Sequence, residues 1–191
     1  MPPPARPQDR SNTVYIGKAT VYVGIDPGNS GGICVLYPEG QIAVTEMLPK
    51  ADTLLWLKRK LDLGSAYKHR VILEQVGGYI GKGAAESQQG GNTGDSMFKF
   101  GASYGALEMM LVALALPDIC GLDLRYDTKT PQVWQRAVKC PPRKGKTKGQ
   151  HKGVLANLAR HYFPQKTGLV TLKTADAMLI ALYARDHYNW I

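Results

Sequence analysis

Short runs of apolar, often β-branched residues recur along the chain and are separated by turn signals. Three such runs follow one another near the start, with Pro27-Gly28-Asn29 and Pro38-Glu39-Gly40 between them. Runs of this length, bounded by Gly and Pro, are typical of buried strands. The predicted strands are Val21–Asp26, Gly32–Tyr37, Gln41–Met47, Arg70–Val76 and Asp123–Tyr126.

Other segments carry apolar residues three and four positions apart, which predicts helices with one buried face. Pro131 suits the first position of one of them. The predicted helices are Asp52–Leu63, Met97–Leu116, Thr130–Val138, Gly153–Tyr162 and Lys173–His187. Strands followed by alternating helices and strands indicate an α/β domain with a mixed sheet.

Two segments break this pattern. Residues 1–18 are rich in Pro and polar residues, which predicts a disordered tail before a single domain at 19–191. The tail lacks the apolar core of a secretory signal. The segment Gly77–Ser96 contains seven glycines, and a loop of this length in a folded domain is usually functional or disordered. No uninterrupted apolar run has the roughly 18 residues that cross a membrane, so we expect no membrane partner.

Basic residues outnumber acidic ones by 24 to 15, which gives a net charge of +9. This surplus favours a polyanionic partner, although a basic protein without one is the alternative. The segment Lys139–Lys152 has no acidic residue, so it is either a phosphate-binding surface or a solvated loop. Its basic residues are Lys139, Arg143, Lys144, Lys146, Lys148 and Lys152.

The three cysteines are scattered and form no Cys-x-x-Cys pair or zinc-finger spacing. We expect Cys34, Cys120 and Cys140 to be free thiols, as in a reducing compartment.

Three carboxylates lie in apolar surroundings, where an unpaired charge is costly. Asp26 ends the first predicted strand, Glu74 lies near the end of the fourth, and Asp176 lies in the first turn of the last helix. Each has a simpler explanation: a turn residue for Asp26, a surface residue for Glu74, and a favourable helix-dipole contact for Asp176. If the three meet, their repulsion calls for a cation, and oxygen ligands favour Mg²⁺ or Mn²⁺.

The order of these motifs resembles the RuvC-like Holliday junction resolvases of the ribonuclease-H-like superfamily, in particular those of phages and bacteria. The resemblance covers about residues 20–187. The segment from Thr130 to Ala159 matches in layout, with a Pro-Gln-Val helix, a basic loop and a Lys-x-Gln helix start. The other matching stretches are GIDPGNSGGICVL (24–36), VILEQV (71–76), SMFKFGASYGALEMML (96–111) and KTADAMLIALYARDH (173–187).

The resemblance implies a five-stranded mixed sheet flanked by helices and an endonuclease that cuts four-way DNA junctions symmetrically. Asp26 would be shared by two Mg²⁺ or Mn²⁺ ions, and Glu74 and Asp176 would each complete one site. Lys148 would lie near the scissile phosphate. Many members carry a fourth ligand one turn before the last Asp, where this chain has Lys173. Either three carboxylates suffice, another residue supplies the fourth group, or Lys173 contacts phosphate.

The resemblance also places the Gly-rich loop near the junction centre. Tyr79 is the nearest aromatic to stack on a base, Ile80 is an apolar candidate wedge, and Lys82 is a candidate phosphate contact. A surface loop with an incidental Tyr is the alternative. The expected DNA-binding residues are Tyr79, Lys82, Arg143, Lys144, Lys146, Lys152 and Lys173.

Symmetric cutting of a four-way junction requires two related active sites, so the resemblance also implies a homodimer. Gly101, Ala102 and Gly105 would allow another helix to approach closely. The cytoplasm of a bacterial or phage-infected cell is the expected location, with an organelle as the alternative.

Three other functions fit parts of the sequence. An actin-like or sugar-kinase-like ATP-binding domain also begins with apolar-Gly-x-Asp-x-Gly, as residues 24–28 do. A branched-DNA-binding protein without cleavage would explain Lys173 as the mark of a degraded metal site. A ribonuclease-H-fold nuclease acting on RNA or hybrids is the third.

Overall fold

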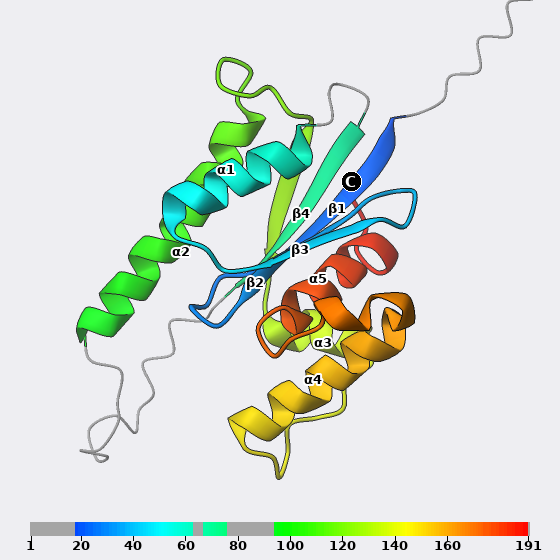
Figure 1. Cartoon of the computed structure of the whole chain (residues 1–191). Coiled ribbons are helices and arrows are strands. Elements are labelled where there is room, and N and C mark those ends of the chain that lie inside the picture. Colours follow the sequence, from blue (N-terminus) through cyan, green and yellow to red (C-terminus); the bar gives the residue numbers. More distant parts are fainter. Residues whose placement is uncertain (1–17, 63–66, 76–93, 191) are drawn as a thin grey trace, which may run out of the picture.

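A computed structural model describes residues 18–62, 67–75 and 94–190 and shows one five-stranded sheet with helices on both faces (Figure 1). The sheet order is β3-β2-β1-β4-β5. β2 is antiparallel to β1 and β3, whereas β4 is parallel to β1 and β5. The strands are β1 (Ala19–Asp26), β2 (Gly32–Leu36), β3 (Ile42–Glu46), β4 (Tyr67–Glu74) and β5 (Leu124–Lys129).

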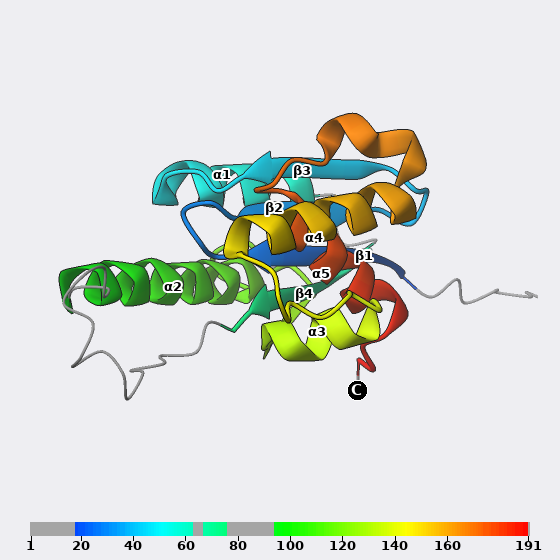
Figure 2. The same cartoon turned by 90° about the horizontal axis from the view of Figure 1, so that it is seen from below.

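Helices cover the two faces in separate groups (Figure 2). One face is covered by α1 (Lys50–Leu61) and α2 (Gly94–Ala115). The opposite face is covered by α3 (Pro131–Ala137), α4 (Lys148–Tyr162) and α5 (Ala175–Asp186), with a short 3-10 helix, η1 (Pro164–Leu169), between the last two. The strands of a sheet that is buried on both faces are nearly continuous runs of apolar residues. For this reason the strands could be predicted from the sequence.

Alternation of side chains along β1 assigns its residues to the two faces. Val21, Val23 and Ile25 pack in the cluster that contains α1 and α2. Tyr22 packs in the cluster that contains α5, and Asp26 follows the same parity. The terminal carboxylate of β1 therefore lies on the face that α5 covers.

Close packing of α5 on β1 depends on Gly24 in the middle of the strand. A Cβ at this position would lie 2.3 Å from the Ala177 carbonyl oxygen and 2.3 Å from the Ala181 amide nitrogen. Any larger residue would separate the helix from the strand, because both colliding atoms are backbone. Gly24 thus determines how near the first turn of α5 comes to the end of β1.

The predicted α/β class, mixed sheet and five strands are confirmed, with strand ends differing by up to three residues. The predicted helix at Gly153–Tyr162 was too short, because α4 begins at Lys148 with a capping box between Thr147 and Gln150. Gly94–Ser96, predicted as loop, belongs to α2, and η1 was not predicted. Cys34, Cys120 and Cys140 are free. The tail up to residue 17 lies outside the described residues.

α2 has an apolar outer side that the described chain leaves uncovered. Over Phe98–Ala115 it is long and apolar enough to cross a membrane, judged by length and composition alone. This property was not predicted from the sequence, because polar residues interrupt the apolar run. Leu107, Leu111 and Leu114 are buried in the core, as expected of a helix that covers a sheet. Phe98 and Met109 are 76% and 65% exposed.

Candidate active site

Three acidic side chains lie within electrostatic range of one another near the carboxyl ends of β1 and β4. These strands are parallel neighbours, and Ile25 pairs with Leu73, so the residues that follow, Asp26 and Glu74, end the two strands side by side. Asp176 lies in the first turn of α5, which Gly24 allows to approach the same strand. The structure therefore brings together the three carboxylates that the sequence singled out.

The pKa values of the three carboxyl groups show that they are desolvated and mutually repelling. Burial is the largest cause of a raised pKa for each. It raises the pKa of Glu74 to about 8, with further contributions from the charges of Asp26 and Asp176. The pKa of Asp176 rises to about 6, with a contribution from Asp26. Three negative charges in such surroundings require a compensating cation to remain ionised at neutral pH.

Each carboxylate is held differently. The Gly28 amide donates to Asp26 Oδ1 at 3.2 Å, and the indole Nε1 of Trp134 donates to Glu74 Oε2 at 3.1 Å. Trp134 is fully buried, so this hydrogen bond is shielded from water. Oδ1 of Asp176 is buried and has no hydrogen-bond partner among the described residues. An unpaired buried carboxylate oxygen is costly, so a bound group that supplied a partner for this atom would be favoured here.

The turn after β1 is built closely around Asp26. A Cβ on Gly31 would lie 2.2 Å from the backbone oxygen of Asp26 and 2.7 Å from its Cγ. A Cβ on Gly32 would lie 3.1 Å from the Lys173 carbonyl oxygen. The glycines of this turn therefore let the backbone wrap the carboxylate and let the segment before α5 pass close to β2.

Two lysines of α4 supply positive charge to the carboxylates. Lys148 and Lys152 lie one turn apart on α4, and both charges lower the pKa of Asp26 against the larger effect of burial. Lys152 Nζ lies 3.9 Å from Asp176 Oδ2. Lys148 thus lies within electrostatic range of Asp26, and Lys152, expected on the DNA-binding surface, lies beside Asp176.

The remaining expected DNA contacts divide into three groups. Arg143 and Lys144 are exposed in the loop before α4, and Lys146 donates to the Pro142 carbonyl oxygen at 3.1 Å. Lys173, at the expected position of a fourth ligand, has its Nζ 2.6 Å from Glu46 Oε2. Tyr79, Ile80 and Lys82 lie outside the described residues.

The three carboxylates suit a divalent ion in chemistry but not in spacing. Within the described residues, no three His, Cys, Asp or Glu side chains are gathered closely enough to hold a metal ion. The chemistry of the set nevertheless fits Mg²⁺ or Mn²⁺, since it consists of carboxylate oxygens only and Asp176 Oδ1 is unpaired.

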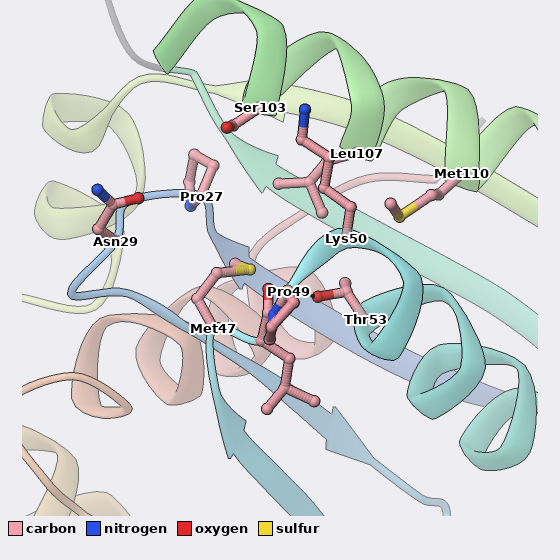
Figure 3. Close-up of a pocket in the computed structure, with 10 residues that line it drawn as sticks. Pro27, Asn29, Met47, Pro49, Lys50, Thr53, Ser103, Leu107 and Met110 are labelled. Atoms are coloured by element: carbon pink, nitrogen blue, oxygen red, sulfur yellow. Dashed lines mark hydrogen bonds between the residues drawn. The ribbon is translucent and has the colours of Figure 1, made fainter. Parts of the chain in front are cut away.

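A pocket of about 400 Å³ adjoins the turn on the α1–α2 face (Figure 3). Its walls are mostly apolar, and Lys50 is the one charged side chain among its described lining residues. Because Pro27 follows Asp26 directly, the pocket abuts the carboxylate site through the backbone. Its lining includes Pro27, Asn29, Met47, Lys50, Ser103, Leu107 and Met110.

Sequence reasoning missed the roles of Trp134 and Gly24. A Gly inside a strand often indicates close backbone approach, so Gly24 carried a usable signal. The contact of Trp134 with Glu74 had no such signal, because it joins residues 60 positions apart.

No protein-family model matches this chain, and no curated protein matches its sequence.

Proposed function

We propose that this protein is a metal-dependent endonuclease with a ribonuclease-H-like sheet, which resolves four-way DNA junctions in the manner of the RuvC-like enzymes. One observation carries the proposal: Asp26, Glu74 and Asp176, from two strands and a helix, meet at one sheet edge beside two lysines. The order of motifs that resembles this family supports it independently.

Asp26, Glu74 and Asp176 would hold the metal. The buried Oδ1 of Asp176 lacks a protein partner, and all three groups resist ionisation without compensating charge. A bound divalent ion supplies a water activated for attack and stabilises the charge on the leaving oxygen. Trp134 fixes one oxygen of Glu74, which leaves the other to face the site.

The lysines and the basic loop would hold the DNA backbone. Lys148 is exposed at the start of α4, and its charge reaches Asp26, so it is suited to contact the scissile phosphate. Arg143 and Lys144 extend this positive surface away from the carboxylates. Lys146, Lys173, Tyr79 and Lys82 are proposed as further DNA contacts. Neutralising several phosphates gives binding that weakens steeply with salt.

The outer side of α2 would form the homodimer seam. Phe98 and Met109 are largely exposed on this helix. A Cβ at Gly101 or Gly105 would meet no described atom within 4 Å. Packing within the described chain therefore does not explain these small residues, whereas close approach of a second α2 does. A two-fold dimer places two active sites on symmetry-related DNA strands.

The proposal is tested by incubating purified protein with labelled four-way junction, three-way junction and linear duplex in Mg²⁺, Mn²⁺ or EDTA. We expect paired nicks near the centre of the four-way junction only, and none in EDTA. Binding without cleavage in either metal would support a branched-DNA-binding protein instead. ATP hydrolysis without junction binding would support the ATP-binding alternative, and cutting confined to RNA or hybrids would support the third.

A further inference from the structure

The ammonium of Lys152 is directed toward the candidate active site, and the residue is partly buried there. Its Nζ donates to the Ser30 carbonyl oxygen at 3.2 Å and to the Leu172 carbonyl oxygen at 3.5 Å. The same atom lies 3.9 Å from Asp176 Oδ2. Its side chain is 21% exposed, against 48% for Lys173.

These contacts join the two segments that carry the metal-binding candidates. Ser30 belongs to the turn that follows Asp26, and Leu172 precedes the helix that carries Asp176. The ammonium is therefore surrounded by two carbonyl oxygens and a carboxylate oxygen, a ligand set that also suits a hard divalent cation. The charge of Lys152 also lowers the pKa of each of the three carboxyl groups, against the larger effect of burial.

We propose that Lys152 is a built-in cation of this site and takes the place of one of the two divalent ions, so that each chain binds a single divalent ion tightly. This inference rests on the proposed metal-dependent function and changes its stoichiometry. A second divalent ion in the same place would have to displace an ammonium that donates to two carbonyl oxygens and lies 3.9 Å from a carboxylate oxygen, and an ion beside that ammonium would be repelled by it.

Lys148 and Lys152 thus have different tasks on the same helix. Lys148 is exposed at the start of α4 and can meet a phosphate from outside, so its variants should alter DNA cleavage. Lys152 is a positioning residue, because it acts on the carboxylates rather than on the substrate. A purely structural role, in which it only ties the turn at Ser30 to the segment at Leu172, would leave metal stoichiometry unchanged.

The test measures how many Mn²⁺ ions bind to the metal-free full-length protein, and how tightly. Calorimetry and electron paramagnetic resonance of unbound Mn²⁺ monitor the binding. The wild type is expected to bind one Mn²⁺ per chain. Lys152→Gln is expected to bind two, or to bind the second at least about tenfold more tightly than the wild type. Lys152→Arg retains the cation and should keep one ion. Lys144→Gln removes the same charge from an exposed site of the basic loop and is the matched control.

Tight binding of two Mn²⁺ ions per wild-type chain would overturn the inference, and this result does not depend on whether Lys152→Gln folds. Unchanged stoichiometry and affinity in a folded Lys152→Gln protein would overturn it as well, as would an equal change in Lys144→Gln. The proposed metal-dependent function itself predicts that the wild type binds Mn²⁺ and that Asp26→Asn weakens this binding. If the wild type bound no Mn²⁺, or if Asp26→Asn bound it equally well, that function would be contradicted, so the two failures are distinguishable.

Discussion

At the scale of single residues, Glu74 has a more strongly raised pKa than Asp176. Burial and two neighbouring carboxylates raise its pKa from the ordinary 4.5 to about 8. The folded protein without metal therefore binds a proton here that the unfolded chain releases at lower pH. Such a group contributes stability below the unfolded pKa, and this contribution is lost as pH rises through the folded pKa.

The metal-free protein should consequently lose stability between about pH 5 and pH 8, and Glu74→Gln should remove much of this loss. Thermal unfolding in EDTA measures this loss of stability. At pH 8.5 the melting temperature of the variant should be about 2–4 °C above that of the wild type, which corresponds to roughly 1 kcal/mol. At pH 5 the two should differ little. An equal offset at both pH values would show that Glu74 does not titrate in this range.

Trp134 should matter to catalysis beyond its contribution to the core. Trp134→Phe keeps an aromatic ring but removes the donor to Glu74 Oε2. A hydrogen bond to a charged group contributes about 1.5–3 kcal/mol, so cleavage of bound junction should slow about tenfold or more. Val138→Ala trims another fully buried side chain of the same core cluster and is the control for lost packing. Equal rates in the two variants would make Trp134 a core residue only.

Residue-level prediction from sequence succeeded where a side chain sits in unusual surroundings along the chain. Asp26, Glu74 and Asp176 are carboxylates within apolar runs, and they do converge. Lys152 was identified only as part of a basic segment, because the direction in which a lysine points depends on where its helix begins. The Trp134–Glu74 contact depends on tertiary packing, which no local pattern encodes.

At the scale of elements, the packing of α5 on β1 positions the site. Gly24→Ala should destabilise the protein by about 3 kcal/mol or more. The added Cβ would collide with backbone atoms of α5, which cannot move aside as a side chain can by changing its rotamer. Gly153→Ala, whose Cβ meets no described atom within 4 Å, should be neutral or stabilising in helix α4. Urea unfolding of both variants provides the comparison, and similar stabilities would contradict this role of Gly24.

The strands were predicted more accurately than the start of α4. Burial on both faces gives strands a clear apolar signal. The first turn of α4, by contrast, contains Lys148, Gly149 and Gln150, which resemble the loop before it. Its capping box at Thr147 and Gln150 was the available signal. Recognising it would have placed Lys148 and Lys152 on one helix beside the carboxylates.

At the scale of the whole molecule, the exposed side of α2 predicts self-association. Wild-type protein should sediment at about twice the 20.9 kDa chain mass. Phe98→Glu combined with Met109→Glu should yield monomers, because two charges would be buried in an apolar seam. Leu55→Glu changes an exposed apolar residue of α1 and should leave the dimer intact. A monomeric wild type would contradict the seam on α2.

The class of the fold followed from the sequence, but its arrangement did not. Alternating strands and helices indicate a mixed sheet, whereas the order β3-β2-β1-β4-β5 depends on contacts between residues far apart in the chain. The convergence of β1, β4 and α5 at one end of the sheet is likewise a property of that arrangement. Each of these elements carries one of the three carboxylates, so their convergence brings the carboxylates into one candidate site.

The central claim is that these carboxylates cut DNA through a divalent ion. The most direct measurement is the cleavage of an end-labelled four-way junction by wild type and Asp26→Asn in Mg²⁺, with junction binding measured for both in Ca²⁺. The account predicts symmetric nicks by the wild type, no detectable nicks by Asp26→Asn, and similar junction binding by the two proteins. Equal cleavage by Asp26→Asn, or no cleavage by a wild type that binds the junction in Mg²⁺ and in Mn²⁺, would contradict it.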